Sequence, residues 1–89
     1  MTHDAYSDTA NSLITPAGDC FAITPQDTAL LPRATKAIYV GIGGDLVVRP
    51  VESSADVTFR NVIAGSILDI RVKAVRATGT TAQDIVGLA

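Results

Sequence analysis

Cysteine, histidine and tryptophan are nearly missing from this chain of 89 residues. Cys20 is the only cysteine and His3 the only histidine, so the chain cannot form an internal disulfide or supply a Cys/His cluster for zinc. A nucleophile would also lack an oriented base, because His3 lies close to the N-terminus. We therefore expect no catalytic residue, no cofactor and no metal site, and we expect the protein not to be an enzyme.

Long apolar runs are also lacking. No stretch approaches the roughly 20 residues that cross a bilayer, and the N-terminus has neither the basic head nor the apolar centre of a signal peptide. A net charge of −2 gives no basic footprint for nucleic acid. We expect neither a membrane nor a nucleic acid as a direct partner, and we expect synthesis in a cytoplasm.

Aromatic side chains are scarce although the chain is 47% hydrophobic. The four aromatic residues are Tyr6, Phe21, Tyr39 and Phe59. Without tryptophan the chain offers no aromatic platform for sugars. A β-domain of this length buries only roughly 60 to 65% of its unfolded surface, so it commonly needs additional stabilisation. With disulfides and zinc excluded, the remaining source of stability is oligomerisation.

Lysine and arginine are missing from residues 1–32, which contain four aspartates. Residues 33–89 contain seven basic residues against five acidic ones, a net charge of +2. Residues 1–20 show neither strand nor helix periodicity over most of their length, so we expect an extended or flexible N-terminal arm followed by a single β-domain over 21–89. The arm could lie on a basic surface of a neighbouring subunit or partner, or it could be a solvated tail.

A period of two begins after Arg33. Ile38, Val40 and Ile42 fall on one face of the strand that this alternation predicts. Gly43 and Gly44 then predict a two-residue hairpin turn with a returning strand, because glycine tolerates the positive φ angles of such turns. A phosphate-binding loop is disfavoured here, since no helix follows the glycines.

Further strands are predicted over 55–60, 67–77 and 84–88, separated by turns at 61–66 and around Gly79. We expect the last strand to lie inside a sheet, because the chain ends on apolar residues. One helical turn could form over 26–31 between two prolines. Short strands at roughly ten-residue spacing predict an all-β fold, a small antiparallel β-sandwich or barrel of about six to eight strands.

Candidate interface residues are either apolar or basic. Arg71 and Lys73 share one predicted strand face, which is either a stripe for a partner or a solvated face that protects the sheet edge. Basic residues flanking other strands could receive the acidic arm of a neighbour, although exposed ion pairs contribute only about 0 to 1 kcal/mol each. The complete candidate set is Leu13, Ile14, Phe21, Leu30, Leu31, Arg33, Lys36, Tyr39, Arg60, Arg71 and Lys73.

Several segments of the chain carry a family resemblance. They are Phe21-x-Ile23-Thr24-Pro25-x-Asp27-Thr28, then LPRATKAIYVG over 31–41, GDLVV over 44–48, VTF over 57–59, AGSIL over 64–68, Arg71-Val72 and ATGTTA-x-DIV over 77–86. In order and spacing this pattern resembles the short spike base proteins of tailed bacteriophages and gene transfer agents. The match covers residues 21–89 in one continuous stretch.

The resemblance implies a structural protein of the virion, assembled in the bacterial host cytoplasm and without enzymatic activity. Its implied partners are further copies of itself in a symmetric ring such as a pentamer, a capsid protein, and a spike or fibre protein joined to the capsid at the vertices. Three alternatives stay open: an adaptor for a tail-tip or baseplate fibre, a module that binds host glycans, and a small hydrolase with a site shared between subunits.

Overall fold

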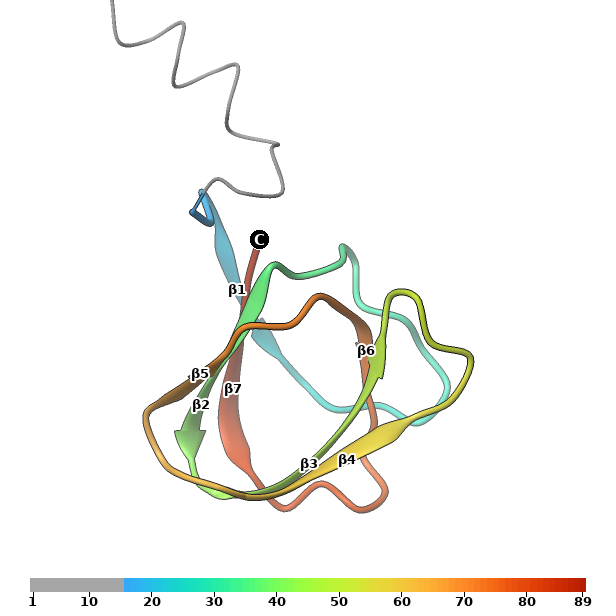
Figure 1. Cartoon of the computed structure of the whole chain (residues 1–89), viewed down its shortest axis with the longest axis vertical. Coiled ribbons are helices and arrows are strands. Elements are labelled where there is room, and N and C mark those ends of the chain that lie inside the picture. Colours follow the sequence, from blue (N-terminus) through green and yellow to red (C-terminus); the bar gives the residue numbers. More distant parts are fainter. Residues whose placement is uncertain (1–15) are drawn as a thin grey trace, which may run out of the picture.

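The computed structural model describes residues 16–89, which form seven strands and no helix. The strands are β1 (Cys20–Ile23), β2 (Ala37–Ile42), β3 (Gly44–Pro50), β4 (Val57–Val62), β5 (Ser66–Leu68), β6 (Val72–Val75) and β7 (Gln83–Leu88). All pairings are antiparallel, in a four-stranded sheet ordered β1-β7-β2-β5 and a three-stranded sheet ordered β4-β3-β6. The two sheets curve around a common interior (Figure 1), so the predicted antiparallel all-β fold is confirmed.

The core lies between the two sheets and is built from inward-facing aliphatic residues. Ile38 and Val40 on β2 are fully buried, as their alternation predicts, and Leu46 and Val48 on β3 meet them from the other sheet. Burial of an aliphatic side chain of this size stabilises a fold by about 1.5 to 3 kcal/mol. Ile42, expected on the same inward face, is instead 47% exposed at the end of β2.

The glycine pair at 43 and 44 forms a corner, and the predicted hairpin is wrong. β2 and β3 belong to different sheets, so the chain crosses from one sheet to the other at this point. A Cβ atom on Gly43 would lie 2.5 Å from the carbonyl oxygen of Val62, and Gly44 has a φ of 155°. Glycine is needed in either arrangement, so the local sequence cannot distinguish a sheet-switching corner from a turn.

The long strand predicted over 67–77 is divided into β5 and β6, which belong to different sheets. Thr35, fully buried, lies at the break: its hydroxyl donates to the carbonyl of Ile70 at 3.4 Å and accepts from the N–H of Val72 at 3.1 Å. Val72, Ala74 and Val75 are all buried, so burial does not alternate along β6, and the β3–β6 register shifts within this strand.

The connection from β1 to β2 runs along the edge of β6 and contains no helical turn, contrary to the prediction for 26–31. The backbone N–H groups of Gln26, Leu31 and Thr35 donate to carbonyl oxygens of β6 at 2.9, 2.8 and 3.0 Å. These bonds replace the local bonds of a helix, and they place the connection across the gap between β6 and β1 (Figure 1). We call residues 24–36 the crossing loop.

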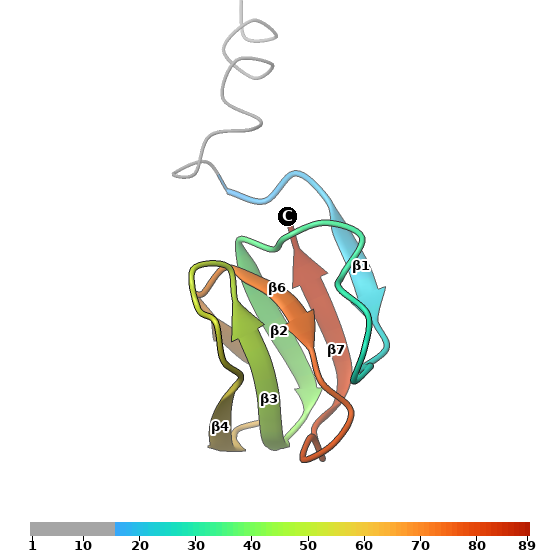
Figure 2. The same cartoon turned by 90° about the vertical axis from the view of Figure 1, so that its right-hand side faces the viewer.

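The last strand lies inside a sheet, as predicted, because β7 pairs with β1 on one side and β2 on the other. The N–H groups of Gly18 and Asp19 both donate to the carbonyl of Ala89, whose own N–H donates to Asp19. The start of β1 and the C-terminal end of β7 therefore lie side by side (Figure 2). Of the candidate interface residues, Leu13 and Ile14 lie outside the described residues.

Candidate interaction surfaces

The outer face of the four-stranded sheet carries a row of apolar side chains. Ala22 on β1 lies opposite Val86 on β7, Val86 opposite Tyr39 on β2, and Tyr39 opposite Ile67 on β5. Cross-strand partners share a face of the sheet, and the neighbouring residues Ile38 and Ile85 are buried, so this row points outward. We call these four residues the apolar row.

The apolar row includes two large side chains that are exposed. Tyr39 is 38% exposed and Ile67 is 61% exposed. The row crosses all four strands of the sheet. Contiguous exposed apolar patches often mark contacts with other proteins. The outer face of the four-stranded sheet is therefore a candidate for contact with another protein.

The three-stranded sheet presents a contrasting outer side with ion pairs. Asp56 accepts from Arg49 at 2.8 Å and from Arg76 at 3.3 Å, and Arg60 pairs with Asp45 at 3.2 Å. Desolvation raises the pKa of Asp56, but hydrogen bonds from the two arginines outweigh it and hold that pKa below its ordinary value. These charges are already satisfied within the chain, so this side is less suited to an apolar contact.

Asp27 fastens the crossing loop to the turn between β6 and β7. Its carboxylate accepts from the N–H of Ala77 at 3.0 Å, and from both the N–H and the hydroxyl of Thr78 at 2.8 and 2.7 Å. The backbone bond from Thr78, followed by the bond from its hydroxyl, lowers the pKa of Asp27. Arg76 strengthens the attachment, because its guanidinium donates to the carbonyl of Asp27 at 3.0 Å.

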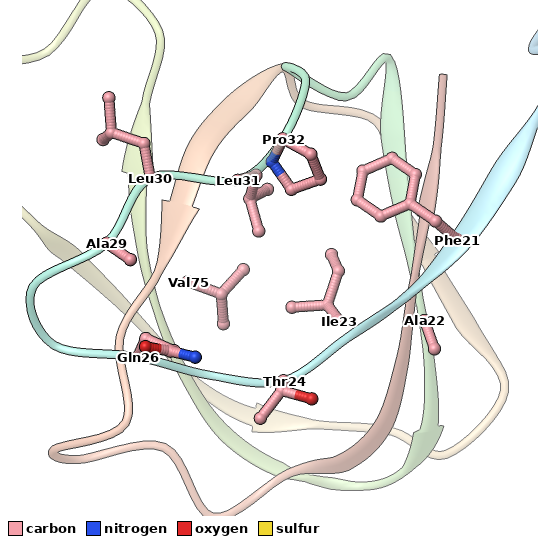
Figure 3. Close-up of a pocket in the computed structure, with 10 residues that line it drawn as sticks. All are labelled: Phe21, Ala22, Ile23, Thr24, Gln26, Ala29, Leu30, Leu31, Pro32 and Val75. Atoms are coloured by element: carbon pink, nitrogen blue, oxygen red, sulfur yellow. The ribbon is translucent and has the colours of Figure 1, made fainter.

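A hollow of about 230 Å³ lies between β1 and the crossing loop (Figure 3). Leu31, Ile23 and Val75 point into it, whereas Leu30, 63% exposed, lies at its rim and points away from Leu31. We call this site the hollow. Its lining residues are Phe21, Ala22, Ile23, Thr24, Gln26, Ala29, Leu30, Leu31, Pro32 and Val75.

The apolar candidates from the sequence fall into two places. Phe21, Leu30 and Leu31 come together at the hollow, although the first and the last are ten positions apart in the sequence. Tyr39 lies apart from them in the apolar row. The sequence could group neither set, because the first depends on the path of the crossing loop and the second on strand pairing.

The basic candidates do not form one patch. Arg33 pairs with Asp19 at 3.0 Å and Arg60 with Asp45, so both contact acids of their own chain. Arg71 precedes β6 and is exposed, whereas Lys73 is a half-buried residue of β6 whose carbonyl accepts from Leu31. The single strand face expected for Arg71 and Lys73 is absent, because β6 begins only at Val72. Lys36 directly precedes β2 and is half-buried.

Sequence reasoning missed Ile67 and Val86 as surface residues. Ile67 is adjacent to the inward-facing Leu68, so strand alternation indicates that Ile67 faces outward. The alternation does not indicate which residue of a neighbouring strand lies beside it. Only the pairing of β5 with β2 brings it opposite Tyr39. The free Cys20 is exposed at the start of β1.

Two structural observations bear on other kinds of site. Within residues 16–89, no group of three or more His, Cys, Asp or Glu side chains could hold a metal ion. The same residues contain no helix with the length and hydrophobicity to cross a membrane.

Comparison with solved structures identifies a related protein. No protein-family model and no curated protein matches the chain. A chain in the structure of the capsid of a native gene transfer agent particle, computed with C5 symmetry, is 43% identical. The match covers 97% of the present chain and 99% of that chain, with a TM-score of 0.82. The chain belongs to the family of this capsid-particle protein.

Family membership establishes the general role. The chain is a structural protein of virions or virion-like particles, and its location is the particle. This agrees with the broader part of the resemblance seen in the sequence, a particle protein of phages and gene transfer agents.

Proposed function

We propose that the protein is a spike base adaptor, which forms a symmetric ring and joins a spike or fibre to the capsid at its vertices. The observation that carries the proposal is the 43% identical relative, whose capsid structure was computed with C5 symmetry. Five-fold symmetry is the symmetry of a capsid vertex, and a small protein in contact with that axis would meet its neighbours in a closed ring.

The surfaces of the domain support this role. An adaptor in a ring has to contact copies of itself and at least one other protein. The described residues offer an apolar row on one side, and beyond β1 a hollow rimmed by the exposed Leu30. A domain that makes no internal disulfide gains stability from such contacts.

We also propose that the role of the protein is structural and not catalytic. Binding energy in this protein would serve assembly, so the critical residues would be apolar side chains such as Tyr39 and Ile67. Substitution there should change assembly and leave no enzymatic deficit to detect. Hydrolysis of a host polymer by purified protein would contradict this part of the proposal.

The oligomeric mass of the purified full-length chain tests the ring. Light scattering after size-exclusion chromatography, at micromolar concentration, should give a single species with several times the monomer mass. A dilution series should show whether that species dissociates as a cooperative ring. A monomer throughout the series would contradict the proposed ring.

A further inference from the structure

We infer that the ring contact is head-to-tail: Tyr39 and Ile67 of one subunit dock at the hollow of the next subunit, beside Leu30. This inference rests on the proposed ring and identifies its two surfaces. The hollow is lined mainly by aliphatic side chains, together with Thr24 and Gln26. Each surface includes a large apolar side chain that is exposed in the single chain, Ile67 at 61% and Leu30 at 63%.

The docking residues and the hollow lie at different places around the domain. Tyr39 on β2 and Ile67 on β5 are separated by β7 from β1, which lines the hollow, and Ala22 on β1 belongs both to the apolar row and to the lining. A contact in which one surface of a subunit binds a different surface of the next subunit is heterologous. Such contacts close into a ring when the rotation between subunits allows it. A contact of the apolar row with itself would instead produce a two-fold dimer.

Charge favours the contact between different surfaces. Asp69 follows β5 and Asp84 lies near the start of β7, so acids lie close in sequence to Ile67 and Val86. Near the hollow, Lys73 lies beside Leu31, and the nearby acids Asp19 and Asp27 are already bound within the chain by Arg33 and Thr78. Docking of the row at the hollow brings acidic and basic residues near each other, whereas docking of two rows brings acids together.

The hollow also has the shape for such a contact. It is open between β1 and the crossing loop, and aliphatic side chains project into it (Figure 3). Interfaces gain most of their affinity from a few large side chains that enter pockets near their centre. Ile67 and Tyr39 are large and exposed enough to be the side chains that enter the hollow.

Single substitutions test each surface separately. Ile67→Arg and Leu30→Arg each place a charge at an exposed position, so both variants should keep the thermal stability of the wild type. Each should weaken association by about tenfold or more and yield monomers at micromolar concentration by light scattering. Val57→Arg is the matched control, because Val57 is 43% exposed on β4, away from both surfaces, and it should leave the ring intact.

Mixing the two variants tests the head-to-tail arrangement. The Ile67→Arg chain retains an intact hollow, and the Leu30→Arg chain retains an intact row, so an equimolar mixture should form a heterodimer of twice the monomer mass. A mixture that stays monomeric would overturn the head-to-tail contact, as would rings formed by either variant alone. A wild type that is itself monomeric would instead contradict the ring on which the inference rests.

Discussion

The aromatic ring of Phe21 covers the bare backbone of Gly87, its cross-strand partner on β7. A Cβ atom on Gly87 would lie 2.8 Å from the ring Cζ and 3.1 Å from Cγ2 of Thr35. The missing side chain therefore gives the phenyl ring its place beside the core and at the wall of the hollow. An aromatic side chain that covers a glycine across a sheet compensates for the packing that glycine lacks.

Gly87→Ala should destabilise the domain, because the added methyl group displaces the Phe21 ring. Overpacking of this kind costs about 1 to 3 kcal/mol. For a domain of this size each kcal/mol lowers the melting temperature by roughly 4 to 8 °C. Gly18→Ala is the matched control, since no atom lies within 4 Å of a Cβ there. Equal melting temperatures for the two variants would contradict the account of Phe21 and Gly87.

Gly43→Ala should destabilise the domain more than Gly87→Ala. The added Cβ would meet the carbonyl oxygen of Val62 at 2.5 Å and the backbone nitrogen of Ala64 at 3.0 Å. Backbone atoms of a paired strand cannot move aside as a phenyl ring can, so the strain stays at the sheet-switching corner. Urea denaturation of the two variants provides the comparison, and the reverse order would show that the corner is not constrained in this way.

Stability should fall in acid in part because of Asp27. Its pKa in the folded protein lies below the ordinary value of 3.8, so its contribution is fully present above that value and is lost as the pH falls through the folded pKa. Asp27→Asn should therefore lower the melting temperature at pH 7, and the difference from wild type should narrow below about pH 4.

Melting curves from pH 7 to pH 2 provide this test. Glu52→Gln is a suitable control, because Glu52 is exposed in the turn after β3. At neutral pH the melting temperature of Glu52→Gln should differ less from that of the wild type than the melting temperature of Asp27→Asn does. A difference between Asp27→Asn and wild type that stays constant down to pH 2 would contradict a role for the ionised carboxylate.

Deleting residues 1–15 should leave the β-domain folded and weaken its incorporation into particles. The deleted segment contains Asp4, Asp8, Leu13 and Ile14 and no lysine or arginine, which is the basis for the predicted arm that contacts a partner. The described strands and their backbone pairing begin beyond it. Melting temperature and the amount of protein in purified particles are the two readouts, and unchanged incorporation would contradict the arm hypothesis.

Local pattern was sufficient to predict the class of the fold and much of the core. Alternation alone places Ile38 and Val40 inward, because side-chain direction in a strand depends only on its immediate backbone. The apolar C-terminus likewise predicts an interior position for β7. These inferences need no knowledge of which strands pair.

Membership of the two sheets could not be predicted in this way. Gly43 satisfies a hairpin turn and a corner equally well, and the break between β5 and β6 depends on Thr35, which arrives from a distant segment. The composition of the candidate surfaces could not be predicted either. Tyr39 could be identified from its own strand, but Ile67 becomes its neighbour only through the pairing of β2 with β5.

Electron cryo-microscopy of the intact particle, with a map that resolves individual subunits, tests the central claim most directly. We expect a ring of these chains between the capsid vertex and a spike or fibre, with Ile67 of each subunit at the hollow of the next. Copies located at the tail tip or baseplate, or single copies without contact between neighbours, would contradict the vertex adaptor.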